Sequence, residues 1–407
     1  MNNKLEDIYS SRRIKSFLFS MMLFGIVIGL YNGIFNNYLH EILGMTKAER
    51  GWLELPRELP GLLIFAILAL LNRFTEIKLI RLAFFITAVG LAGLFFFGES
   101  KALAIVLLAV YSTGEHMMMP VRQSVGLHMA KSGKEGRAMG VLRSFGNAGQ
   151  AAGFYIAPAI LLFFAAASRE GSAFLRYRIV FLTGFIILVT GLIVTSFLKK
   201  SGKTVNRKKI HIEKKYSRYY LLEVFFGARK QVFLTFAPYV LITVYDAGPE
   251  LISMLYGIWS IINIFIGPAV GRMLDHFGYR KVLVFDAVVL ILICLVYGFA
   301  HRIFAFHTAY ILICIVFVLD AIMFAFGMAR DMYARSLAET KDEVTSTLAT
   351  GLSVNHLVSI VIAIFGGMLW ERMGIEYLFG FAAVLGVGSL IFSAMLQKPE
   401  KTLKMLK

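Results

Sequence analysis

Long runs of apolar residues constrain this chain of 407 residues more than any other feature. A helix needs about 20 consecutive apolar residues to cross the hydrocarbon core of a bilayer. About twelve runs reach that length, and most of the connections between them are short. They lie near residues 15–40, 49–72, 77–97, 102–130, 136–165, 176–198, 218–246, 250–273, 280–300, 305–334, 343–369 and 374–396. We therefore predict an all-α polytopic membrane protein with about twelve transmembrane helices.

The composition excludes several other classes of protein. Hydrophobic residues make up 58% of the chain and charged residues only 16%, which is too apolar for a soluble globular enzyme, a disordered chain or a fibrous repeat. The runs show no period-two alternation, and this excludes a transmembrane β-barrel. Cys294 and Cys314 lie inside apolar runs, so we expect no disulfide framework, no metal site and no cofactor.

The basic residues are concentrated in one connector. Residues 199–217 are rich in Lys and Arg, with Glu213 as the only acid. Because cytoplasmic loops carry an excess of Lys and Arg, we predict that the connector and both termini are cytoplasmic. The net charge of +17 then reflects topology and attraction to anionic headgroups, not nucleic-acid binding. Short loops without glycosylation sequons favour a bacterial cytoplasmic membrane, and we expect a monomer.

This connector divides the chain into two predicted halves of six spans, residues 1–198 and residues 218–407. Four pairs of identical residues are each separated by 208 positions, as expected of an internal repeat. The pairs are Arg122 and Arg330, Ala130 and Ala338, Glu135 and Glu343, and Asn147 and Asn355. Two of these pairs are polar residues inside predicted spans, which favours pseudo-equivalent halves.

The loop between the eighth and ninth runs carries a short pattern of defined spacing. It reads Gly271-Arg-Met-Leu-Asp275-His-Phe-Gly278-Tyr-Arg280-Lys281. This resembles the G-x-x-x-D-x-x-G-x-R-K/R loop of the major facilitator superfamily. By that resemblance Gly271 permits close helix contact, Asp275 caps or pairs with a helix end, and Gly278 allows a tight turn. Arg280 and Lys281 would anchor the loop on the cytoplasmic side.

Other fragments are similar to the same family. Arg122–Gly126 resembles its R-x-x-Q-G element, Gly136–Gly140 its entry to the fifth span, and Gly149–Gly153 the G-x-x-x-G of its antiporter element, here without the proline. The first-half counterpart of the loop, residues 68–78, departs from the pattern, with Asn72 where an Asp is expected. The resemblance implies two six-helix bundles around a central cavity lined by spans one, four, seven and ten, and transport by alternating access.

Polar residues inside predicted spans are the candidate site, because a charge near a helix centre costs about 2.5–3.5 kcal/mol unless it faces a cavity or a partner. The predicted substrate-cavity residues are Asn32, Asn36, Glu115, His116, Arg122, Asn147, Arg229, Lys230, Asp320 and Asn355. Glu115 and Asp320 are also the candidates for proton coupling, since desolvation raises the pKa of a carboxyl group and a nearby cation lowers it.

Structural roles remain open for several of these residues. Arg229 and Lys230 could form ion pairs with Glu115 or Asp320 that only fix helix packing. His116 and His356 could be hydrogen-bonded polar residues without a titration role. In the second span, Arg57 could pair with Glu54 or Glu58, and the run Met117–Met119 favours packing over metal binding. Gly146, Gly149 and Gly153 favour close helix packing.

We predict a secondary active transporter that moves a small organic solute by alternating access, coupled to protons by symport or antiport. The predicted cavity carries more cations than anions, which favours an anionic or zwitterionic solute. One alternative is a multidrug/proton antiporter that works in efflux, and another is a transporter-like lipid flippase or receptor. No enzyme is predicted, because H-E-x-x-H, G-x-S-x-G and paired intramembrane protease aspartates are absent from the sequence.

Overall fold

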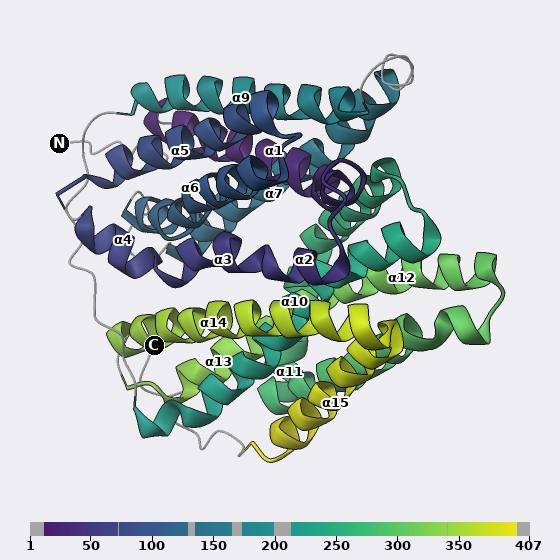
Figure 1. The fold of residues 1–407 in the computed structure, drawn as a ribbon. Coiled ribbons are helices and arrows are strands. Elements are labelled where there is room, and N and C mark those ends of the chain that lie inside the picture. The colour runs from purple at the N-terminus through teal and green to yellow at the C-terminus, as the bar shows by residue number, and fades with distance from the viewer. Residues whose placement is uncertain are drawn as a thin grey trace. The chain divides into compact units, whose positions relative to one another are not determined.

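The computed structural model describes residues 12–71, 73–128, 135–164, 173–198, 213–339 and 341–396, and within these ranges it contains helices and no strand (Figure 1). Asn72, Ala130, residues 199–212 of the connector and the C-terminal tail lie outside the described residues. The predicted division of the chain at the connector therefore stays a prediction. The all-α class predicted from the apolar runs is confirmed.

The chain forms two compact units that exchange short segments. Unit 1 comprises Met1–Gly44, Pro56–Asn206 and Gly248–Ser260, and unit 2 comprises Met45–Leu55, Arg207–Ala247 and Ile261–Lys407. The first turns of the second predicted span thus belong to unit 2, and the first turns of the eighth belong to unit 1.

Unit 1 is a bundle built around its first helix. Its helices are α1 (Arg12–Glu41), most of α3 (Glu54–Leu62), α4 (Ile64–Leu70), α5 (Glu76–Phe97), α6 (Lys101–His128), α7 (Glu135–Phe163) and α9 (Phe174–Ser196). Helix α1 packs against α7 and α9, and α5 packs against α6 and α9 (Figure 1). The predicted second span is broken into α2 (Lys47–Trp52), α3 and α4.

Glycines allow α1 and α7 to approach closely. A Cβ atom at Gly149 or Gly153 would collide with backbone atoms of α1, and a Cβ atom at Gly25 or Gly29 would collide with backbone atoms of α7. This pairs two G-x-x-x-G elements across one helix interface. The packing role predicted for Gly149 and Gly153 agrees with this geometry, while a Cβ at Gly146 would meet only an Arg122 side-chain nitrogen, at 3.9 Å.

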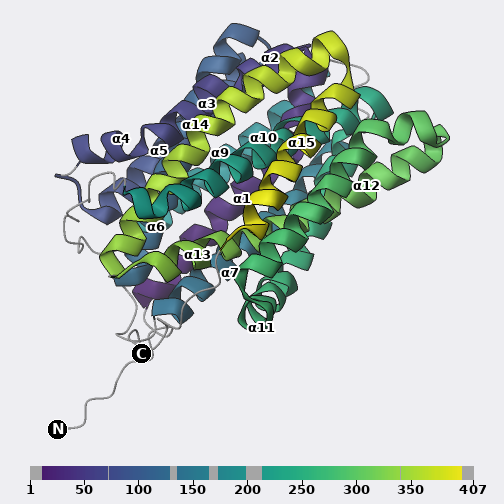
Figure 2. The same ribbon diagram turned by 90° about the horizontal axis from the view of Figure 1, so that it is seen from below.

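Unit 2 is organised around α10 (Ser217–Tyr245). Its other elements are α2, η1 (Lys214–Tyr216), most of α11 (Pro249–Ile303), α12 (Phe306–Met323), η2 (Phe324–Gly327), α13 (Met328–Leu337), α14 (Lys341–Met373) and α15 (Ile375–Ala394). Helix α10 packs on α12, α13, α14 and α15, and the view in Figure 2 shows α10 between α14 and α15. Helix α10 can therefore present polar side chains to several neighbours at once.

Three helices of unit 2 begin at nearly constant offsets from three helices of unit 1, two to three residues short of the predicted spacing of 208. Helices α10, α12 and α14 begin 205, 205 and 206 residues after α1, α6 and α7. Within the described ranges, eight helical segments are long and apolar enough to span a membrane, and one of them, Phe265–Ile303, includes the ninth predicted span. The multi-pass membrane class follows from these segments.

Gly278 separates the eighth and ninth predicted spans. Helix α11 is assigned as one element over 55 residues, but Gly278 within it has φ 76° and ψ 161°. That backbone conformation is open essentially to glycine alone. The turn predicted for Gly278 is therefore present, and it interrupts an element that is more than twice as long as the roughly 20 residues of one span.

Candidate substrate and proton sites

Arg229 of α10 is held by two carboxylates. Its Nη1 donates hydrogen bonds to both oxygens of Asp286, at 2.8 and 3.0 Å, and its Nη2 donates to Asp320 Oδ1 at 3.2 Å. Only 5% of Arg229 is exposed, so its charge is compensated inside the protein as buried charges must be. Helices α10, α11 and α12 are joined at this point.

Asp286 was not predicted as a site residue. It is the only charged residue between Lys281 and His301 in an otherwise apolar stretch. A single acid in such a run is a signal for a buried partner, because an unpaired carboxylate would oppose membrane insertion. The pairing of Arg229 with Asp320 agrees with the structural alternative considered for this arginine.

Lys230, the next residue of α10, has a different environment. Its Nζ donates to Asn355 Oδ1 on α14 at 2.9 Å, and Asn355 Nδ2 donates to Glu223 Oε2 at 3.4 Å. Glu223 in turn forms a 2.6 Å ion pair with Arg330 of α13, whose guanidinium carbon lies 3.4 Å from the ring centroid of Phe226. Within the described part of the chain Lys230 forms no ion pair with an acid.

In unit 1 the predicted cavity residues come from α1, α6 and α7. Glu115 and Arg122 on α6 are half-buried, and across the described ranges neither forms an ion pair. On α1, Asn36 is buried and Asn32 is half-buried, as is Asn147 on α7. In the described part of unit 1, Asn32, Glu115, Arg122 and Asn147 form no hydrogen bond or ion pair with one another, so the grouping of the predicted residues stays a prediction.

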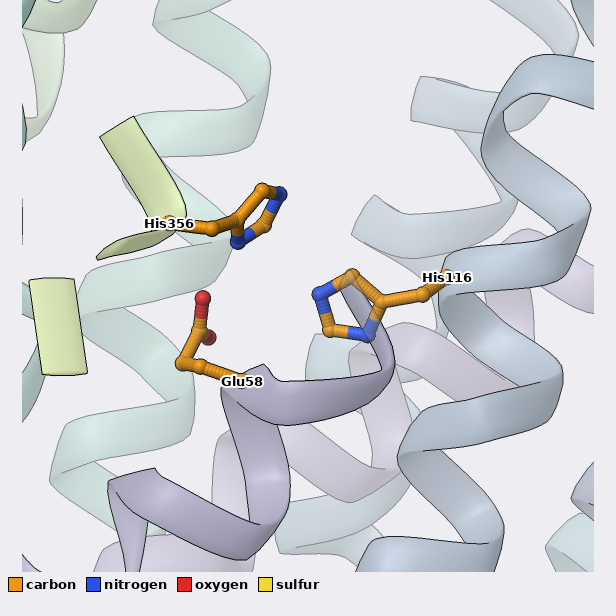
Figure 3. A group of neighbouring side chains, drawn as sticks. All are labelled: Glu58, His116 and His356. Atoms are coloured by element: carbon orange, nitrogen blue, oxygen red, sulfur yellow. The ribbon is translucent and has the colours of Figure 1, made fainter. Parts of the chain in front are cut away.

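His116 has hydrogen-bond partners on its own helix. Its Nδ1 lies 3.0 Å from Ser112 Oγ and 2.9 Å from the Ser112 carbonyl, and Ser112 Oγ donates to the carbonyl of Arg57 at 2.5 Å. The Glu58 carboxylate lies within 4.8 Å of a His116 ring nitrogen (Figure 3). The third residue labelled there, His356, is a buried residue of α14 in unit 2.

Arg57 and its acidic neighbours form local ion pairs. Arg57 Nη2 lies 3.4 Å from Glu58 Oε1, which is one of the two pairings predicted for it. Glu54 instead pairs with Arg50 at 2.5 Å in unit 2, and both side chains are fully buried. The alternating charges of the second predicted span are thus satisfied locally.

The loop motif shows mixed agreement with its expected roles. Asp275, Arg280 and Lys281 are exposed, and in the ranges described above Asp275 has no hydrogen bond or ion pair. A Cβ atom built at Gly271 would meet no described atom within 4 Å. The close helix contact expected at Gly271 is therefore not found. The residue of this loop that must be glycine is Gly278, because its φ is positive.

Comparison with known proteins decides the family. The profile of the Major Facilitator Superfamily matches residues 17–334 and, in a second overlapping match, residues 219–406. The chain belongs to the Major Facilitator Superfamily. The resemblance seen in the loop motif is thereby confirmed, and so is the expectation of a membrane transporter and not an enzyme.

Solved structures of transporters share the fold at low sequence identity. The nucleoside transporter NupG, in a single-residue variant, is 13% identical with a TM-score of 0.75, over 95% of this chain and 100% of that one. The D-xylose-proton symporter is 14% identical with a TM-score of 0.69, over 96% and 99% of the two chains. A bacterial homologue of the human lysosomal transporter Spinster, inward-facing and unoccupied, is 14% identical with a TM-score of 0.66, over 93% and 94%. No curated protein matches the sequence.

Proposed function

We propose that this superfamily member is a proton-coupled secondary transporter of a small anionic or zwitterionic organic solute. The observation that carries the proposal is the contrast between Arg229 and Lys230. Arg229 is neutralised by Asp286 and Asp320, whereas Lys230 is half-buried and, among the residues that the structure describes, bonded only to the neutral amide of Asn355. A cation placed in this way can exchange its amide partner for a carboxylate or phosphate of the solute.

Arg122 of unit 1 supports the same substrate charge. It is half-buried and, in the described portion of unit 1, has no acidic partner within ion-pair distance. Intramembrane cations without a paired acid raise the local positive potential and favour an anionic ligand over a lipophilic cation. In this proposal Asn32, Asn36, Asn147 and Asn355 supply neutral hydrogen-bonding groups for the rest of the solute.

The proton site in this proposal is the pair of carboxylates that share Arg229. With both ionised, the group Arg229, Asp286 and Asp320 carries a net charge of −1, and with one protonated it is neutral. Either state leaves the guanidinium with a charged partner, so a proton can be gained or lost without exposing a lone buried cation. Glu115 remains a second candidate, since it is half-buried on a span that the family uses to line its cavity.

We further propose a monomer in a bacterial cytoplasmic membrane, with both termini and the basic connector on the cytoplasmic side. The concentration of Lys and Arg in residues 199–217 supports this orientation. A cysteine placed at Ser201 should resist an impermeant reagent added to whole cells. Rapid labelling at that position would reverse the proposed orientation.

A ligand screen tests the proposed substrate class. Purified protein is heated in the presence of organic anions, zwitterions, sugars and lipophilic cations, because a ligand that binds the folded state raises the unfolding temperature. Stabilisation by anions or zwitterions that is lost in Lys230→Gln supports the proposal. Preferential stabilisation by lipophilic cations would assign the protein to multidrug efflux instead.

A further inference from the structure

A small cavity lies beside the two buried arginines of unit 2. It has a volume of about 20 Å³, and its walls come from α10, α11, α13 and α15. Arg229, Asp286 and Arg330 line it on the polar side, and Ser389 of α15 lines it as well. A volume of this size accommodates one water molecule, since about 10–15 Å³ is needed.

Each of the two arginines has a buried Nε donor without an acceptor. The Nε atoms of Arg229 and Arg330 are buried, and neither has a hydrogen-bond partner in the part of the chain that the structure describes. The two residues are 5% and 8% exposed. A buried guanidinium N–H without an acceptor is costly, and ordered water is the usual way in which such groups are satisfied in protein interiors.

The two carboxylates on Arg229 differ in their relation to this cavity. Asp286 lines it and its side chain is 15% exposed, whereas Asp320 does not line it and its side chain is 6% exposed. Besides Arg229, the described titratable groups near this pair are the guanidinium of Arg330, which lines the same cavity, and the buried thiol of Cys294 on α11. Asp286 is therefore the carboxylate that cavity water can reach.

We infer that this cavity holds a water molecule through which protons enter the transporter, and we call this cavity the proton port. Asp286 is the carboxyl group that receives these protons. The inference rests on the proton coupling proposed above and names the residue and the route. The cavity water donates one proton to Asp286 and regains one from a hydronium ion of the solvent, so that one O–H bond forms on the carboxyl group and the O–H bond that breaks in the cavity water is replaced. Asp320 stays ionised and keeps Arg229 paired.

The port lies on a different side of α10 from the proposed solute site. Lys230 faces Asn355 on α14, whereas the cavity is lined by α11 and α15 and includes neither of these two residues. Protons and solute would therefore reach α10 from separate neighbours. Filling the cavity should slow protonation without removing the solute site.

Infrared difference spectroscopy of the full-length protein in proteoliposomes tests this directly, with protons as the only ligand. After a downward pH jump, we expect a protonated-carboxyl band and a water O–H band that shifts in water enriched with oxygen-18. The carboxyl band should be lost in Asp286→Asn. In Ser389→Leu, which fills the cavity, the water band should disappear and the carboxyl band should rise at least about tenfold more slowly.

Val387→Leu is the matched control, because Val387 is an exposed residue on the same helix. It should behave like the wild type. If Ser389→Leu does not fold, Ala382→Val narrows the same cavity with a smaller added volume. This variant should also weaken the water band and slow the rise of the carboxyl band. The inference is overturned if the isotope-sensitive water band persists in these variants, or if Asp320→Asn abolishes the carboxyl band while Asp286→Asn keeps it.

Failure of the proposed function would give a different result. If no carboxyl band titrates in the wild type, Asp286 and Asp320 bind no proton in this range, and the proton coupling proposed for them falls with the port. A carboxyl band that titrates and is lost in Asp286→Asn would support Asp286 as the proton site. If that band nevertheless rises as fast in Ser389→Leu as in the wild type, only the proposed route through the cavity is wrong.

Discussion

Arg229 and Lys230 are neighbours on α10, yet their side chains reach different helices and different kinds of partner. Arg229 contacts the carboxylates of α11 and α12, and Lys230 contacts the amide of Asn355 on α14. Adjacent residues point about 100° apart around a helix, so one of two neighbouring cations can be fixed in an ion pair while the other faces a neutral group. This divergence gives the two residues separable roles.

The first prediction concerns these two residues. Arg229→Ala leaves Asp286 and Asp320 buried without their cation, so we expect it to lower the free energy of unfolding by about 3–5 kcal/mol. Lys230→Ala removes one hydrogen bond and should cost about 1 kcal/mol, while abolishing stabilisation by an anionic ligand. Denaturant unfolding in detergent and ligand thermal shifts separate the two effects. Equal losses of stability would show that both cations are structural.

The second prediction concerns the interface between α1 and α7. Gly149→Ala places a methyl group against the backbone of Met22, and overpacking of this kind costs about 1–3 kcal/mol. Gly140→Ala is the matched control on the same helix, because Gly140 is exposed and its Cβ would meet no described atom within 4 Å. We expect a lower unfolding midpoint for the first variant and an unchanged or higher one for the control.

The third prediction concerns the loop within α11. Gly278→Ala forces a side chain into a backbone conformation with φ 76°, at a cost of about 1–3 kcal/mol. Gly271→Ala, a few residues earlier in helical backbone with open space around it, should be neutral or slightly stabilising. Unfolding midpoints of both variants check this, and equal behaviour would mean that the turn can adopt another conformation.

The fourth prediction concerns pH. Lys215 pairs with Glu343 at the start of α14, and its ammonium lowers the pKa of that carboxyl from 4.5 to about 2. A carboxyl group with a lowered pKa stabilises the fold above its ordinary value, and this contribution is lost as pH falls from about 4.5 towards 2. The contribution is small and screened by salt because the pair is partly exposed. Glu343→Gln should therefore weaken the fall in unfolding midpoint between pH 5 and pH 3, most visibly at low ionic strength.

Much of the fold follows from the sequence because the bilayer requires long apolar helices. The predicted spans 15–40, 77–97 and 176–198 agree with α1, α5 and α9 to within a few residues. The break of the second span into α2, α3 and α4 was not predicted, since apolar length alone gives no sign of it. The turn at Gly278 was predictable because a glycine stands between two apolar runs, and glycine is the residue that tolerates the backbone conformations of tight turns.

The site could be predicted only in part. Their position inside apolar runs marks four residues as candidates: Arg229, Lys230, Asp320 and Asn355. Which of them pair depends on which helices pack against α10. Asp286 was missed although its isolation in an apolar run is visible in the sequence. Helix phase alone could not show that, among the described residues, Arg229 pairs with two acids and Lys230 with none, because that depends on tertiary contacts.

Solute-dependent proton movement in proteoliposomes tests the central claim most directly. Vesicles containing the wild-type protein and a trapped pH indicator receive an anionic or zwitterionic solute identified by the thermal-shift screen. We predict that the solute changes the internal pH with wild-type protein, and that Lys230→Gln and Asp286→Asn each abolish the change, the first by loss of solute binding and the second by loss of the proton site. Solute entry without any proton movement in the wild type, or an unchanged signal in Lys230→Gln, would contradict the account.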